Sequence, residues 1–268
     1  MRKLVCVGDS HASFFSGVDK IQPVFPEQSH DRIHGLESVR LGAVLAYSLH
    51  REGTQEQGRE KLFAKLKSLD CNENAILFCF GEIDCRYHLL KQAETRSIPV
   101  ISVVEDCIEK YFRVIMEIKA MGFQVVVWNA IPTTHDNFNV EYPNYGTHEQ
   151  RNDCTRLFNQ ILQKYCEKGG IVFIDIFNKL VDKSNRTKGY FLFDRVHLGQ
   201  LAMPYFIEKI NEKCNFVKLD VVHQKKSYLN FVREYVKYYY FTLEIRLRNW
   251  IRKRKVLLFL YRKFIIKT

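Results

Sequence analysis

The feature that most constrains the fold is an uninterrupted apolar run, residues 75–80 (Ala-Ile-Leu-Phe-Cys-Phe), which stops at Gly81. A strand of this kind is hydrophobic on both faces, so it needs cover on both sides. Parallel sheets with a layer of helices on each face supply that cover. The run therefore predicts a central strand of an α/β fold.

Other strands and helices alternate with this run along the chain. Strands are expected at 3–7, 124–129 and 171–175, and helices at 55–69, 104–121, 149–168 and 199–214. Residues 32–40 are expected to form a loop that leads into a further helix, which opens near Gly42 in segment 41–49. The alternation predicts a three-layer α/β/α architecture around a mostly parallel, five-stranded sheet.

Polar residues follow the expected strands at one end. Ser10 follows the first strand, 81–86 follow the third, 129–135 follow the fourth, and Asp194 and His197 lie beyond the fifth. Ligand sites of open parallel sheets lie beyond the carboxyl ends of the strands. We therefore expect these residues to meet at one edge of the sheet.

The first and last of these groups carry the residue types of nucleophilic catalysis. The chain reads Gly8-Asp9-Ser10-His11 after the first strand and Asp194-Arg195-Val196-His197 near the end of the globular part. A serine needs a histidine that takes its proton, and that histidine needs a carboxylate that fixes its tautomer. In isolation, Gly-Asp-Ser is more often an ordinary turn, but order and context favour a Ser10–His197–Asp194 triad.

These blocks resemble the SGNH/GDSL hydrolase family, whose fold is flavodoxin-like and whose nucleophile lies in an N-terminal GDS block. The resemblance implies a triad of Ser10, His197 and Asp194, and an oxyanion hole with the backbone N–H groups of Ser10 and Gly42. The family's third block, G-x-N-D, supplies an asparagine as a further donor. Here the block is Gly81-Glu82-Ile83-Asp84, so an isoleucine stands in the asparagine position.

Three consequences of Ile83 remain open. Another side chain supplies the donor, with Arg86, His88 and Asn129 as candidates; or the polar residues of this block form an ion-pair network that braces the loop; or catalysis is lost. An extended segment would place alternate side chains on one polar face. That face would carry Glu82, Asp84, Arg86 and His88.

The third block, GEIDCR, resembles a subset of SGNH-like proteins that accompany sugar-modifying and polysaccharide-assembly enzymes. The resemblance implies an esterase that removes O-acyl groups, acetyl above all, from a carbohydrate or glycolipid. An O-acyltransferase with the same acyl-enzyme and a non-catalytic carbohydrate-binding or membrane-associated scaffold are the alternatives. Further substrate-binding candidates are Asp9, His11 and Gly81. His11 would serve as a second base, or else face solvent or cap the next helix.

No cofactor or metal is expected. The set Glu82, Asp84 and His88 lacks a zinc-type signature, and the chain has no glycine-rich phosphate loop. The eight cysteines include no CxxC pair, which is typical of reduced thiols in a cytoplasmic protein. The N-terminal apolar run has only five residues and leads directly into Ser10, so we expect no cleaved signal peptide.

The net charge of +11 is unevenly distributed. Residues 218–268 carry 14 Lys and Arg against three acidic residues, whereas residues 1–217 carry 27 of each sign. We therefore expect a hydrolase-like domain at 1–217 and a basic, aromatic, helical tail at 218–268. Basic residues among aromatic and aliphatic ones suit a helix on an anionic membrane surface, so residues 227–268 predict peripheral attachment to the inner face. Nucleic acid is the less favoured partner, and a helical hairpin packed on the domain is the simplest alternative.

Overall fold

The computed structural model describes residues 1–134, 142–220, 236 and 243. It divides the chain into two compact units, Met1–Val222 and His223–Thr268. The helices expected in the tail, and its contact with a membrane, lie outside the described residues apart from Val236 and Leu243. No described helix is long and apolar enough to cross a bilayer.

The first unit is built on one five-stranded sheet in which every neighbouring pair is parallel. The strand order is β2-β1-β3-β4-β5. The bounds are β1 Lys3–Gly8, β2 Leu36–Arg40, β3 Asn74–Cys79, β4 Gln124–Trp128 and β5 Val172–Ile174. The predicted parallel α/β fold is confirmed, and the order is that of flavodoxin-like sheets.

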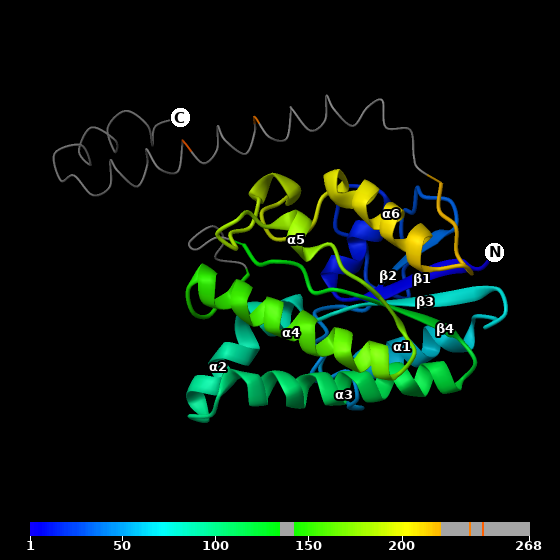
Figure 1. Cartoon of the computed structure of the whole chain (residues 1–268). Coiled ribbons are helices and arrows are strands. Elements are labelled where there is room, and N and C mark those ends of the chain that lie inside the picture. The colour runs from blue at the N-terminus through cyan, green and yellow to red at the C-terminus, as the bar shows by residue number, and fades with distance from the viewer. Residues whose placement is uncertain (135–141, 221–235, 237–242, 244–268) are drawn as a thin grey trace, which may run out of the picture. The chain divides into compact units, whose positions relative to one another are not determined.

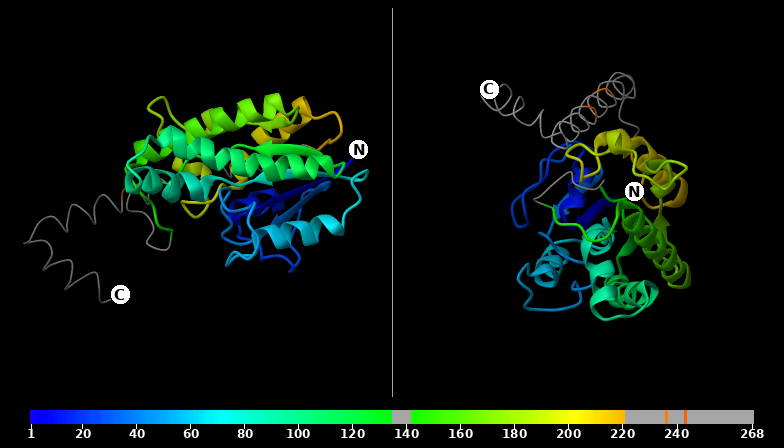
Figure 2. Two further views of the ribbon diagram at one scale, coloured as in Figure 1. Left: turned by 90° about the horizontal axis from the view of Figure 1, so that it is seen from below. Right: turned by 90° about the vertical axis from the view of Figure 1, so that its left-hand side faces the viewer.

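Helices cover both faces of this sheet (Figure 1, with the same layers in Figure 2). The elements on one face are α1 Gly58–Lys67, α2 Leu89–Thr95, α3 Val100–Ala120 and α4 His148–Lys168. Those on the other face are the 3₁₀ segment η1 Ser10–Ser16, α5 Phe177–Leu180, η3 Gly189–Phe191, η4 Gln200–Ala202 and α6 Met203–Lys213. A π-helical turn, η2 Asp84–His88, precedes α2.

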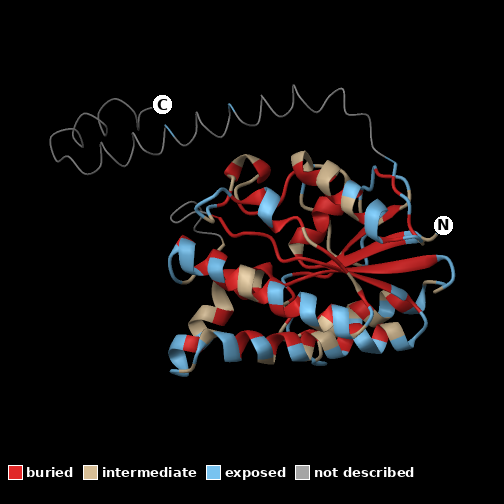
Figure 3. Ribbon diagram, in the orientation of Figure 1, coloured by how far each residue is buried: buried red, intermediate tan, exposed pale blue. Residues whose placement is uncertain are grey.

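The alternation of side chains along each strand divides the core into two clusters. In β1, Val5 and Val7 pack toward α1, α3 and α4, whereas Leu4 and Cys6 pack toward η1 and α6. β3 is buried along its whole length, as its uninterrupted apolar sequence requires (Figure 3). All eight cysteines are free, and only Cys71 is not fully buried.

Two expectations about segments near the site are wrong. Residues 32–40 contain β2, which lies at the edge of the sheet and pairs with β1. The helix expected near Gly42 does not form, because the segment is held from outside. The N–H groups of Ala46 and Tyr47 donate to the Asp84 carboxylate at 2.9 and 3.2 Å, and Gly42 has a φ of +119°.

Candidate active site

Ser10 lies where β1 ends and η1 begins, at the carboxyl edge of the sheet. The backbone of Gly8 passes so close to β3 that a Cβ there would lie 2.2 Å from the Cys79 carbonyl oxygen, so only glycine fits. Asp9 then caps η1, since its Oδ1 accepts a hydrogen bond from the His11 N–H at 2.8 Å. This turn places the Ser10 side chain at the edge of the domain.

The segment after η3 supplies the partners of Ser10. Asp194 Oδ1 accepts from the N–H groups of Val196 and His197 at 3.0 and 2.7 Å, which folds the segment into a tight turn. Asp194 Oδ2 lies 2.7 Å from His197 Nδ1, and His197 Nε2 lies 2.8 Å from Ser10 Oγ. Ser10 is thus linked to His197, 187 positions later in the sequence, and through it to Asp194. The three side chains form one continuous series of hydrogen bonds from carboxylate to imidazole to hydroxyl.

The surroundings of His197 suit a residue that accepts a proton. Burial lowers the pKa of His197 below 6.5, the Asp194 hydrogen bond opposes that effect, and the neighbouring His11 adds to it. Burial raises the pKa of Asp194, but the hydrogen bond and charge of His197 and the backbone donors lower it below its usual range overall. At neutral pH, His197 is therefore neutral and Asp194 is ionised, as proton transfer from a serine requires.

The third block is helical, so the expected extended segment with one polar face is wrong. Glu82 and Arg86 are one helical turn apart, and Arg86 Nε donates to both carboxylate oxygens of Glu82 at 2.9 and 3.1 Å. Glu82 Oε2 also lies 2.9 Å from His11 Nε2. Burial raises the pKa of Glu82, but the charges of Arg86 and His11 outweigh it and bring the pKa to about 2. The block thus carries a buried ion-pair network.

The candidate oxyanion donors take different positions. Leu41 N donates to the Gly8 carbonyl at 2.8 Å, which brings Gly42 beside the strand that carries Ser10. Within the described residues, neither the Ser10 nor the Gly42 N–H donates a hydrogen bond to another group.

The proposed substitutes for the missing asparagine have other partners. Arg86 is buried and binds Glu82 and the Pro143 carbonyl. The Asn129 amide donates to the Ala130 carbonyl, and its oxygen accepts from the Ile176 N–H, so it links the ends of β4 and β5. His88 is half-buried, and Ile83 carries no donor.

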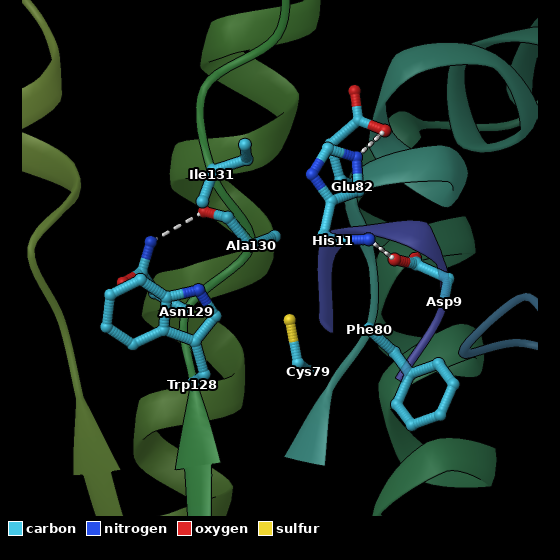
Figure 4. Close-up of a pocket in the computed structure, with 9 residues that line it drawn as sticks. All are labelled: Asp9, His11, Cys79, Phe80, Glu82, Trp128, Asn129, Ala130 and Ile131. Atoms are coloured by element: carbon cyan, nitrogen blue, oxygen red, sulfur yellow. Dashed lines mark hydrogen bonds and ion pairs between the residues drawn. The ribbon is translucent and has the colours of Figure 1, made fainter. Parts of the chain in front are cut away.

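A small pocket lies beside the site, between the ends of β1, β3 and β4 (Figure 4). Its lining includes Asp9, His11, Glu82 and Asn129. Two of its polar atoms, Asp9 Oδ2 and His11 Nδ1, are buried and have no hydrogen-bond partner among the described residues. Burial raises the pKa of Asp9 to about 8, so this acid is neutral at pH 7.

The sequence analysis missed the aromatic residues around His197. The ring of Tyr142 contacts His197 edge to face at 5.4 Å between centroids, and Phe193 stacks on it at 6.0 Å. Phe193 directly precedes Asp194, so its position in the block was a usable signal. No spacing ties Tyr142 to the site. Among the described residues, no group of three His, Cys, Asp or Glu is arranged to hold a metal ion.

No protein-family model matches the chain, and no curated protein matches it. Several solved structures are similar to the chain. A GDSL-like lipase from Bacteroides thetaiotaomicron is 13% identical, with a TM-score of 0.48 over 78% of this chain and 85% of that one. A lipase/acylhydrolase from Enterococcus faecalis is 15% identical, with a TM-score of 0.44 over 83% and 100%. A variant acetyl-xylooligosaccharide esterase from Geobacillus is 12% identical, with a TM-score of 0.47 over 81% and 96%.

The similarity lies in the course of the backbone. The roles of the site residues therefore rest on the geometry of this chain.

Proposed function

We propose that this protein is a serine hydrolase that cleaves O-acyl esters. The observation that carries the proposal is the Ser10–His197–Asp194 chain, with 2.8 Å between hydroxyl and imidazole and 2.7 Å between imidazole and carboxylate. These distances lie within the reach that general-base activation of a serine needs. The neutral state of His197 at pH 7 supports the same reading.

In the proposed reaction, Ser10 Oγ bonds to the acyl carbon while His197 Nε2 takes the hydroxyl proton. The tetrahedral oxyanion is stabilised by the Ser10 and Gly42 N–H groups, each of which would contribute on the order of 3 kcal/mol. As the intermediate collapses, the leaving alcohol receives the proton from His197, and the acyl group stays on Ser10. A water then attacks the acyl carbon, gives its proton to His197, and the acid and the free serine are restored.

For the substrate we propose an O-acetylated carbohydrate or glycolipid. This finer statement rests on the third block, Gly81-Glu82-Ile83-Asp84-Cys85-Arg86, and its resemblance to proteins of polysaccharide assembly. With a sugar hydroxyl in place of water, the same acyl-enzyme would give an acyltransferase. Ile83 favours a third candidate, a scaffold that has kept the fold without the chemistry.

Covalent labelling tests the proposal. A fluorophosphonate should react with Ser10 in the wild-type protein, and the reaction should disappear in Ser10→Ala and fall at least a hundredfold in His197→Ala, because the serine is unreactive without its base. Mass spectrometry of the adduct locates the modified residue. Ser13→Ala is the matched control, since its buried hydroxyl accepts from the Gln22 N–H and should not react. A folded wild-type protein that is not labelled would point to the scaffold.

A further inference from the structure

A second histidine lies against the proposed base. The rings of His11 and His197 are 4.7 Å apart between centroids and inclined by 38°. His11 directly follows Ser10 and is 5% exposed. At this distance and in this buried environment, a charge on one imidazole opposes a charge on the other.

Glu82 holds His11 in that position. Its carboxylate is 2% exposed and lies 2.9 Å from His11 Nε2. A dashed line marks this contact in Figure 4. Arg86 binds the same carboxylate and, through the Pro143 carbonyl, the segment that carries Tyr142. Two carboxylate–imidazole pairs therefore lie side by side, Asp194–His197 and Glu82–His11. Only the first reaches Ser10.

Several other groups face His197. Asp194 comes from its own segment, Asp9 and His11 come from the β1–η1 turn, Glu82 lies before η2, and Tyr142 lies before α4. Burial and His11 lower the pKa of His197, whereas Asp194 and Glu82 raise it. The Glu82–His11 pair thus contributes effects of both signs.

We propose that His11 and Glu82 are positioning residues that set the pH range in which His197 accepts the proton of Ser10. The inference rests on the proposed function. The His11 ring lies against His197 and lowers the pKa of His197, which disfavours the His197 imidazolium. The negative charge of the Glu82 carboxylate favours the His197 imidazolium. The Arg86 guanidinium keeps the buried Glu82 carboxylate ionised.

The test uses two substitutions of opposite electrostatic effect in the full-length chain. His11→Gln keeps an amide that can donate to Glu82 but removes the imidazole beside His197, so the pKa of His197 should rise by about one unit. Glu82→Gln removes the negative charge, so the pKa of His197 should fall by about one unit. Nuclear magnetic resonance titration of the His197 ring, identified by its loss in His197→Gln, measures both shifts.

Matched controls are His34→Gln and Glu27→Gln, which make the same chemical changes at exposed positions and should leave His197 unchanged. Shifts of the same sign in His11→Gln and Glu82→Gln, or no shift, would overturn the inference. If Glu82→Gln does not fold, His11→Gln decides the question together with Glu82→Asp, which keeps the charge and should preserve the wild-type value.

The titration needs no turnover, so its outcome is independent of the proposed hydrolysis. Absence of fluorophosphonate labelling defeats the proposed function, whereas an unmoved His197 defeats this inference. If the proposed function and this inference are both correct, the rate of labelling should fall on the acidic side with the pKa of His197. That fall should move to higher pH in His11→Gln and to lower pH in Glu82→Gln.

Discussion

Asp9 is a fully buried acid at the site. Its side chain is fully buried beside Ser10, where Oδ1 caps η1 and Oδ2 has no partner in the part of the chain that the structure describes. Burial raises its pKa to about 8, and the nearby Glu82 carboxylate adds to the rise. Because the folded state binds this proton more tightly than the unfolded state, Asp9 favours folding at low pH and opposes it increasingly as pH rises from about 4 to 8.

Replacement of Asp9 by asparagine should therefore stabilise the protein at alkaline pH. The amide keeps an oxygen for the His11 N–H and carries no charge at any pH. Since one pKa unit corresponds to about 1.4 kcal/mol, we expect a gain on the order of 3–6 kcal/mol at pH 9 that shrinks toward zero at pH 4. Denaturant unfolding of Asp9→Asn and wild type at both pH values measures it.

Glu27→Gln, which neutralises an exposed carboxylate, is the control for this series and should show no comparable change between pH 4 and pH 9. A constant difference between Asp9→Asn and wild type across that range would mean that Asp9 is ionised in the folded protein.

At the scale of elements, Asp84 joins two segments that are far apart in the chain. It opens the π-helical turn η2, and its carboxylate accepts from the N–H groups of Ala46 and Tyr47. Burial raises the pKa of Asp84 to about 6, although these backbone donors lower it. The same segment, 41–49, contains Gly42, so Asp84 fixes the position of a proposed oxyanion donor.

Asp84→Ala should both destabilise the domain and slow the chemistry. Each of the two N–H groups left without an acceptor costs about 1–3 kcal/mol, so we expect a loss of about 2–6 kcal/mol in the free energy of unfolding. A displaced Gly42 should lower kcat at least tenfold toward a soluble acetate ester. Asp84→Asn retains one acceptor oxygen, so its stability and its kcat should lie between those of Asp84→Ala and wild type.

The control is Asp106→Ala on α3, which breaks an ion pair with Lys110 at the surface and should cost under about 1 kcal/mol. Unfolding by denaturant and steady-state kinetics at pH 7.5 separate the two effects. A normal kcat in folded Asp84→Ala would show that segment 41–49 contributes no donor.

At the scale of the whole molecule, the first unit ends later than charge alone suggested. Val217 and Leu219 are buried in the core beside α6, and the Asn211 side chain bonds both the N–H and the carbonyl of Leu219. The compact unit reaches Val222, five residues past the boundary expected from composition. Leu219, which the charge pattern assigned to the tail, therefore belongs to the core of the first unit.

A chain that ends at Val222 should fold and keep its activity, whereas one that ends at Phe216 should be less stable. Loss of two buried aliphatic side chains at about 1.5–3 kcal/mol each predicts a drop of about 3–6 kcal/mol in the free energy of unfolding. Thermal and denaturant unfolding of the two truncations compare them directly. Equal stability would show that Val217 and Leu219 contribute nothing to the core.

The same truncation tests the membrane proposal for residues 227–268. Full-length protein should sediment with anionic liposomes at low salt, less so at high salt, and the chain ending at Val222 should not. A tail that ignores such liposomes would leave a protein partner as the explanation of its charge.

The amino-acid sequence by itself determined the layers of the fold and the candidate residues of the site. The apolar run at 75–80 could only be buried on both faces, and alternating strands and helices then allow little besides a parallel sheet with its polar groups at the carboxyl edge. Ser10, Asp194 and His197 were identifiable because each follows or closes an element and because the order of such residue types is chemically specific.

Only the tertiary structure decided how the segments between these blocks are held. Residues 41–49 carry a helical pattern but lack a helix, because Asp84, almost forty residues away, accepts their N–H groups. Glu82 and Arg86 were expected on one polar face of an extended segment, yet they lie one helical turn apart in a buried ion pair, and Glu82 also binds His11. Local patterns report propensity and burial, whereas hydrogen bonds and ion pairs between distant segments depend on which groups the completed fold brings within 3 Å.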